Sequence, residues 1–238
     1  MRPVKADIHI HSVLSPCGSL DMSPASIIAK AIEQGLDMIA IADHNSTLNC
    51  SLAVTLGREA GISVLRGAEV TTAEEVHCLA ILPDEKSATA FQSFLNDRLQ
   101  HIRNLPEKFG YQLVLDREEN ITEEVEYFLP AALTASIDEV EEEVHRLGGL
   151  FIPAHIDRPA FSLFSQLGFI PSGLRADAVE VTGSTAVADY PVIKNSDSHL
   201  IDQIGKRYTT YLLDEPTFPE LAMALRGQNE RKILSVTP

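Results

Sequence analysis

The sequence predicts an α/β fold in which βα units build a parallel sheet. The first observation behind this prediction is that apolar, β-branched runs alternate along the chain with segments of helical period. The second is size and composition, because 238 residues with 45% hydrophobic side chains are enough to bury a large core. We therefore expect one domain that spans residues 1–238.

Seven strands are expected, and five helices fall between or after them. The strands are the runs DIHI, DMIAIA, GISVLRGAEV, VHCLAIL, GLFIPA, DAVEV and PVIKNS. The helical patterns lie at roughly 24–34, 47–60, 87–103, 136–147 and 217–227. The first helix has clear boundaries, because Ser23 suits the N-cap, Pro24 the first helical position and Gly35 the end.

Residues 105–135 mix Pro, Gly and acidic residues without a core of their own. We expect a small helical insertion there rather than a second domain. The acidic run 138–143 that follows is interpreted as the solvated face of a helix.

The DIHIH stretch near the N-terminus has an unusual pattern for a strand. Alternation places Asp7, His9 and His11 on one face and Ile8 and Ile10 on the other. We expect the two histidines to point from the end of the strand toward a site, with the isoleucines packed behind them. Asp7 is expected to be buried or to hold a neighbour in place.

Six of the eight histidines occupy similar positions, because they lie at or just beyond the end of a strand-like run. They are His9, His11, His44, His77, His155 and His199. That edge is where sites form in folds built from βα units. Three carboxylates accompany them, Asp43, Glu69 and Asp197. His101 and His145 lie within helical patterns and are expected to be surface or capping residues.

Histidine and carboxylate together, without a cysteine cluster, suit Zn²⁺, Mn²⁺ or Fe²⁺. One metal ion rarely takes more than about six ligands, so nine candidates predict two or three divalent ions. Adjacent ions need a bridging group, and the carboxylate of Glu69 can serve two ions at once.

The ordered strings HIH, DHN, GAE, EVHCLAI, PAH and SDSH resemble the four motifs of the PHP (polymerase and histidinol phosphatase) superfamily over residues 7–199. The resemblance implies a distorted (β/α)7 TIM-like barrel with a metal cluster at the C-terminal ends of its strands. It implies three sets of ligands. They are His9, His11, Glu69 and Asp197 for one ion, Glu69, His77 and His155 for a second, and His44 and His199 with one loop residue for a third.

The loop SVLSPCGSLD departs from this family pattern, because it lacks the Asp or His that many members have after HxH. Ser15, Cys17 and Asp21 are the available substitutes. A thiolate ligand at Cys17 would favour zinc, but a buried, inert cysteine is the favoured interpretation.

Two further residues are expected to act in catalysis. Asp43, beside His44, would orient that histidine or a neighbouring water. Arg158, three residues after His155, would bind the phosphate, and the alternative is a surface ion pair with Asp157.

Net charge and aromatic content limit the classes of substrate that we expect. A net charge of −15 argues against capture of long nucleic acid, and the absence of Trp with 6% aromatic residues argues against a base-stacking platform. We therefore expect a small phosphorylated metabolite or short nucleotide as substrate. The sequence shows no secretory signal and no apolar run of membrane-spanning length, which predicts a cytoplasmic protein without a membrane partner.

The predicted function is a metal-dependent phosphoesterase that acts through a metal-activated hydroxide. Hydrolysis of a non-phosphate ester or amide is an alternative, because such clusters also polarise carbonyl groups. A second alternative is a non-catalytic metal-binding module with the acidic segment 117–143 as its partner surface.

Overall fold

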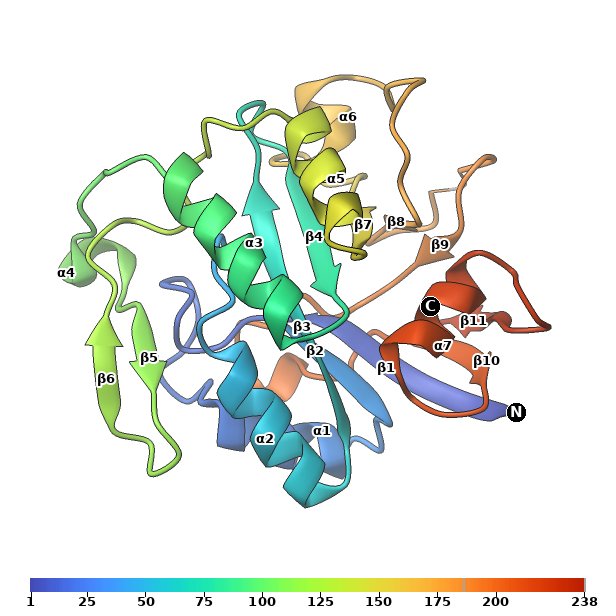
Figure 1. Ribbon diagram of the computed structural model, residues 1–238, viewed down its shortest axis with the longest axis horizontal. Coiled ribbons are helices and arrows are strands. Elements are labelled where there is room, and N and C mark those ends of the chain that lie inside the picture. Colours follow the sequence, from blue (N-terminus) through green and yellow to red (C-terminus); the bar gives the residue numbers. More distant parts are fainter. Residues whose placement is uncertain (186, 238) are drawn as a thin grey trace.

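A curled, mixed sheet forms the centre of the fold (Figure 1). The computed structural model describes residues 1–185 and 187–237. The sheet has seven strands in the order β11-β10-β1-β2-β3-β4-β7. Their bounds are Lys232–Val236 (β11), Thr209–Leu213 (β10), Arg2–Ile10 (β1), Met38–His44 (β2), Ser63–Thr71 (β3), His77–Leu82 (β4) and Leu150–Pro153 (β7).

Only part of this sheet is parallel. β1, β2 and β3 are parallel neighbours, and α1 (Pro24–Glu33) and α2 (Cys50–Ala60) connect them. β4 runs antiparallel to both β3 and β7, and β10 runs antiparallel to β1. The expectation of a parallel sheet was therefore wrong for β4 and β7, and β10 and β11 add further antiparallel pairs. The turn 72–76 is too short for the crossover of about a dozen residues that a parallel connection needs.

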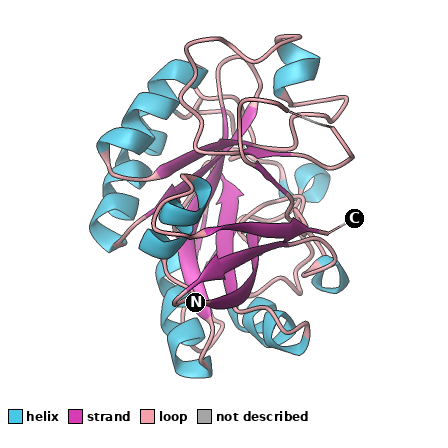
Figure 2. Cartoon of the chain, turned by 90° about the vertical axis from the view of Figure 1, so that its right-hand side faces the viewer, coloured by secondary structure: helices cyan, strands magenta, loops and turns pink. Residues whose placement is uncertain are grey.

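A short parallel pair, β8 (Val179–Glu180) and β9 (Val192–Ile193), lies between β7 and β1. On one side, Ile156 N donates to Glu180 O at 2.9 Å, and on the other, His11 N donates to Ser198 O at 3.0 Å. The sheet thereby curls toward a barrel with helices on its outside (Figure 2). The prediction of a distorted TIM-like barrel is confirmed at this level, as a mixed α/β half-barrel, but a regular (β/α)7 repeat is not established.

The predicted helices are all present. Besides α1 and α2 they are α3 (Glu85–Arg98), α5 (Ile137–Arg146) and α7 (Phe218–Leu225). The Ser23 side chain accepts from Ser26 N, and Gly35 adopts φ +68°, as the boundary signals of α1 require. Two shorter helical elements, α6 (Leu163–Gln166) and η1 (Ile201–Gln203), follow strands near the site.

The segment 105–135 was expected to be helical, and that expectation was wrong. It contains one helical turn, α4 (Pro106–Phe109), and then an antiparallel hairpin of β5 (Leu113–Leu115) and β6 (Ile121–Glu124). Asp116 shapes the hairpin turn by accepting from Asn120 N at 2.8 Å. The hairpin lies at the opposite edge of the molecule from β10 and β11 (Figure 1). That the whole chain is one domain stays a prediction.

The N-terminal strand does not alternate as simply as expected. The register between β1 and β2 shifts between Asp7 and Ile10. As a result Ile8 packs with Ala40 inside the curl, whereas Ile10 packs with Ile39 beneath α1. The two isoleucines therefore do not share one core, although both are fully buried.

Candidate metal centre

One edge of the sheet brings all eight predicted metal ligands together. His9, His44 and Glu69 lie in the last residues of β1, β2 and β3, and the others lie in the loops that follow strands, except His77. His77 is the first residue of β4, not the last as expected. Because β4 runs antiparallel to β3, its beginning meets the end of β3 at the same edge.

The group with four members is formed by His9, His11, Glu69 and Asp197, which are all buried. The two Nε2 atoms are 3.2 Å apart, and Asp197 Oδ1 lies 3.3 Å from His9 Nε2 and 3.1 Å from His11 Nε2. Glu69 Oε1 lies 3.3 Å from His9 Nε2, and Glu69 Oε2 lies 3.3 Å from His11 Nε2. Ligand atoms at the usual 2.0–2.1 Å from a tetrahedral Zn²⁺ stand about 3.3 Å apart, so this group fits a metal ion.

Glu69 also belongs to the neighbouring groups. Its Oε1 lies 3.0 Å from His77 Nδ1 and 2.9 Å from His155 Nε2, and its Oε2 lies 3.2 Å from His44 Nδ1. The carboxylate thus occupies the centre of the cluster, where a bridging ligand belongs. Among the described residues, the buried Nδ1 of His44 and Oδ1 of Asp197 have no hydrogen-bond partner. Such unpaired acceptors are expected where a cation is to bind.

A third group is made of His11, His44 and His199. The His11 ring stacks on the His199 ring at 4.1 Å between centroids and lies 4.6 Å from the His44 ring. Cys17 and Asp21 belong to none of the three groups that the described residues form. Cys17 is exposed, against the expectation of a buried cysteine.

The histidines and carboxylates of the cluster shift one another's pKa values. Burial alone would lower the pKa of His11, but the adjacent carboxylates of Asp197 and Glu69 outweigh it and raise the pKa to about 9. Burial and the nearby His11 lower the pKa of His199 to about 4. Burial opposes ionisation of Glu69, yet His77 and His9 hold the pKa of its carboxyl well below the usual range. The carboxylates therefore favour a positive charge beside them, which a divalent ion can supply in place of a proton.

Asp43 lies beside the cluster, but it does not contact the His44 ring as expected. Its carboxylate accepts from Ser12 N and from Ser15 Oγ, both at 2.7 Å. Ser15 Oγ in turn lies 2.9 Å from His11 Nδ1 and accepts from His44 N at 3.2 Å. Asp43 thus fixes the loop after β1 and reaches His11 through Ser15.

Asp7 is buried at the base of this edge, as expected. Its carboxylate accepts from Ser196 N at 3.0 Å and from Gly205 N at 3.1 Å. These bonds hold the loop that carries Asp197 and His199. Burial raises the pKa of Asp7 to about 6 despite these bonds.

Glu180 is a residue of the site that sequence analysis missed. Its carboxylate lies 3.1 Å from His9 Nδ1 and accepts from His155 N at 3.0 Å and from Asn195 Nδ2 at 2.8 Å. It is buried at the end of β8 and fixes the face that His9 turns toward the cluster. The signal was a glutamate within the apolar run DAVEV, a position where an unpaired charge would be costly.

Arg158 reaches the cluster rather than its sequence neighbour. Its Nη1 lies 2.6 Å from Asp197 Oδ2, and its side chain is 37% exposed. Asp157 instead accepts from Thr182 N at 2.8 Å and from Gly183 N at 2.8 Å. The alternative of an Arg158–Asp157 ion pair was therefore wrong.

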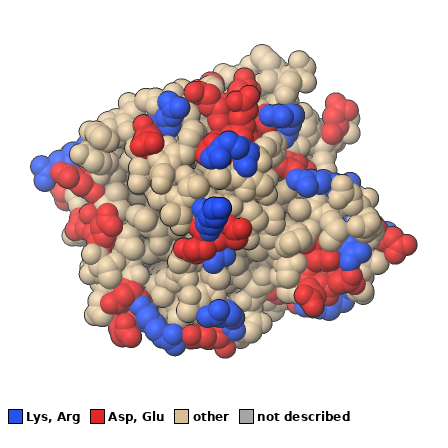
Figure 3. Space-filling model, viewed as in Figure 1, with Lys and Arg blue, Asp and Glu red and all other residues tan. Residues whose placement is uncertain are grey.

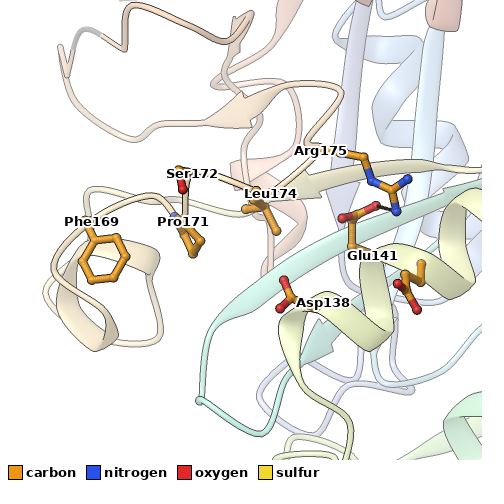
Figure 4. Close-up of a pocket in the computed structure, with 9 residues that line it drawn as sticks. Asp138, Glu141, Phe169, Pro171, Ser172, Leu174 and Arg175 are labelled. Atoms are coloured by element: carbon orange, nitrogen blue, oxygen red, sulfur yellow. Dashed lines mark ion pairs between the residues drawn. The ribbon is translucent and has the colours of Figure 1, made fainter.

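A hollow of about 570 Å³ lies away from this edge, between α5 and the 169–175 loop (Figure 4). Arg175 and Glu141 form an ion pair at its wall, 2.8 Å between Nη2 and the carboxylate. Its lining contains none of the predicted ligands, so the metal chemistry belongs to the sheet edge.

An α/β sheet that gathers buried histidines and carboxylates at one edge is the architecture of a metal-dependent hydrolase. The particular family follows from comparison with known proteins. The chain belongs to the PHP domain family, whose model matches residues 7–156. The resemblance seen in the sequence is thereby confirmed.

The relatives extend the likeness along the whole chain. The uncharacterized protein YqxK of Bacillus subtilis is 25% identical over an alignment of 280 positions, which covers 99% of this chain and 65% of YqxK. The lesion-specific endonuclease PfuEndoQ of Pyrococcus furiosus has a similar structure, with a TM-score of 0.76 and 21% identity over 99% of this chain and 58% of that one. This chain therefore spans less than two thirds of both proteins.

A smaller protein shares the fold more distantly. It is a putative metal-dependent phosphoesterase of Bifidobacterium adolescentis, with a TM-score of 0.58 and 22% identity over 82% of this chain and 87% of that one.

The expectation that long nucleic acid is excluded was wrong. An endonuclease Q that matches 99% of this chain, with a TM-score of 0.72, has been solved with a 27-mer duplex substrate. Net charge was a poor guide, because it averages over the whole surface, while binding depends on local charge. On the face seen in Figure 3, Lys and Arg side chains are interspersed among Asp and Glu.

The helices in the described part of the chain include none with the length and apolar character of a membrane-spanning segment.

Proposed function

We propose that this chain is a metal-dependent phosphoesterase that cleaves phosphodiester bonds of a nucleic acid strand. The observation that carries the proposal is the group of buried histidines and carboxylates around Glu69, with the Arg158 guanidinium at its exposed side. The likeness to an endonuclease Q, which was solved with a 27-mer duplex substrate that carries an abasic lesion at the active site, supports the substrate class. A protein named 5'-3' exoribonuclease from Haemophilus influenzae, 34% identical over 68 residues, supports it as well.

The residues fit a site for two or three divalent ions, Zn²⁺, Mn²⁺ or Fe²⁺. His9, His11, Glu69 and Asp197 would hold one ion, Glu69, His77 and His155 would hold a second, and His44 and His199 would supply ligands for a third. When bound, such ions lower the pKa of water toward neutrality and neutralise charge on phosphoryl oxygens.

The chain's own residues would bind the phosphate and orient the metal-binding histidines. Arg158 has five N–H donors and uses one nitrogen on Asp197, so the rest of its fork can bind a phosphate oxygen. Glu180 keeps His9 in one orientation, and Asp43 does so for His11 through Ser15. The cation at the edge favours a phosphate over an uncharged carbonyl ester.

The first experiment compares ester classes. Purified protein reconstituted with Mn²⁺ or Zn²⁺ is expected to hydrolyse bis(p-nitrophenyl) phosphate and to cut a DNA or RNA oligonucleotide. The variants His9→Ala and Asp197→Asn should lose more than about 100-fold in turnover, because changes beside a ligand already cost about 10–100-fold. His101→Ala is the matched control, since His101 is exposed and stacks only on Tyr127.

Two other outcomes of this experiment would favour the alternative functions. Hydrolysis of p-nitrophenyl acetate without any phosphodiester activity would support the carbonyl hydrolase alternative instead. Stoichiometric bound metal without turnover of any ester would support a binding module and contradict the proposal.

A further inference from the structure

The segment between β7 and β8 carries exposed aromatic side chains, and one of them, Phe161, lies beside the metal centre. Phe161, Phe164 and Phe169 are 45%, 37% and 62% exposed, and the same segment carries His155. Phe169 lines the hollow beside α5, away from the cluster, whereas the Phe161 ring stacks on His77. Phe161 is therefore the exposed aromatic residue that a ligand at the metal centre can reach.

Phe161 is the member of this set that touches the centre. Its ring stacks on the His77 ring at 5.0 Å between centroids and 21° between planes. Its carbonyl accepts from His77 N at 3.0 Å. Its φ of 54° lies in the left-handed region, which is unfavourable for a bulky residue. Strained backbone of this kind persists where the surrounding structure enforces it, and it clusters at ligand-binding sites.

The loop that carries Phe161 is held on both sides. Asp157 accepts four hydrogen bonds, from Thr182 N and Oγ1, Gly183 N and Thr185 Oγ1, at 2.8 to 3.1 Å. Ser162 Oγ donates to Arg158 O at 2.7 Å and accepts from Ser165 N at 3.1 Å. The exposed ring is therefore presented by an ordered loop, which reduces the entropy that a ligand must remove on binding.

A hollow of about 190 Å³ lies next to the ring. Its lining is His77, His155, Arg158, Pro159, Ala160 and Phe161. One wall thus offers an arginine and candidate metal ligands, and the other offers apolar surface. Sites that enclose a whole drug-sized ligand measure about 300–1,000 Å³, so this hollow suits one part of a larger substrate.

We propose that Phe161 is a specificity residue whose free face stacks on the base next to the phosphodiester that Arg158 and the metal centre hold. This inference rests on the proposed function. Arg158 and Phe161 line the same small hollow, so a phosphate on the first places the attached nucleoside near the second. Because every base has a π-face, the stack should depend on the presence of a base and not on its identity.

The test uses a short single-stranded oligonucleotide and a set in which one nucleotide at a time carries a tetrahydrofuran in place of its base. For the wild-type protein with Mn²⁺, one position beside the cut should require its base, with kcat/KM about tenfold lower without it. In Phe161→Leu, which keeps apolar packing on His77, intact and base-free strands should be cleaved equally. Phe161→Tyr should restore the requirement, and Mn²⁺ affinity should be unchanged in both variants.

Three results would overturn the inference, and each has a different meaning. Cleavage by the wild-type protein with no position at which base removal and Phe161→Leu are coupled would remove the stacking role and leave the proposed function intact. No cleavage of any phosphodiester by the wild-type protein would remove the proposed function and this inference with it. An equal loss in Phe161→Leu on all strands, accompanied by weaker Mn²⁺ binding, would assign Phe161 a purely structural role.

Discussion

Glu180 touches His9 on the side away from the cluster, and metal affinity should depend on this contact. The Glu180→Gln substitution keeps the size of the side chain but replaces a carboxylate oxygen near His9 Nδ1. Loss of such a partner typically weakens metal binding by about 10–100-fold. Titration of metal-free protein with Mn²⁺ or Zn²⁺ by calorimetry measures the effect.

The matched control for Glu180→Gln is Glu118→Gln, which alters an exposed glutamate in the hairpin turn. Equal metal affinity in both variants would show that Glu180 does not orient His9.

Some residues of the site could be predicted from the sequence, and others could not. Strand-end positions led to the eight candidate ligands that the structure brings together, although His77 begins β4 rather than ending a strand. Glu180 and the partner of Arg158 could not be found in this way, because they depend on contacts between distant segments, such as that of Arg158 with Asp197.

The insertion that carries the hairpin packs on the loop that follows β1, where Leu113 N donates to Val13 O at 3.2 Å, and Gly110 faces Pro16 of that loop. A Cβ there would lie 1.9 Å from Pro16 O, and its φ of +101° disfavours any other residue. Gly110→Ala should destabilise the protein by more than about 1 kcal/mol, because both strain and overlap must be relieved. For a chain of this size, that corresponds to a fall in Tm of about 2–4 °C or more by calorimetry.

Gly173→Ala serves as its control, because a Cβ at Gly173 meets no atom within 4 Å. Equal Tm values in the two variants would mean that the insertion does not press on the loop.

All five expected helices and all seven expected strands were predictable from hydrophobic periodicity and helix-capping residues. Strand direction was not predictable, and neither were β10, β11 and the hairpin, because these strands are short and, as in the fully exposed β6, can lack an apolar pattern.

Across the whole molecule, stability should depend on pH through His145, which joins α5 to the segment before β8. Its Nε2 lies 3.0 Å from Asp177 and its Nδ1 2.7 Å from Glu141, while Arg226 and Arg175 contact those two carboxylates. The bond to Asp177 is the main cause that raises the pKa of His145 above its ordinary value. A raised histidine pKa stabilises fully below the unfolded value of about 6.5 and loses this effect as pH rises through the folded value.

His145→Gln should therefore reduce the free energy of unfolding at pH 6 and have a smaller effect at pH 9, in urea titrations at both pH values. His101→Gln is the control, because His101 is exposed. A His145→Gln effect that is the same at both pH values would contradict the assignment of a charged histidine.

The proposed function requires that the cluster around Glu69 binds catalytic metal ions. Bound Mn²⁺ or Zn²⁺ per chain and phosphodiester turnover, measured in the same samples of the wild-type protein and His9→Ala, test this requirement. Two or three ions are expected in the active wild-type protein, with fewer ions and little turnover in the variant. Undiminished turnover in His9→Ala, or in wild-type protein stripped of metal by a chelator, would contradict the proposed function.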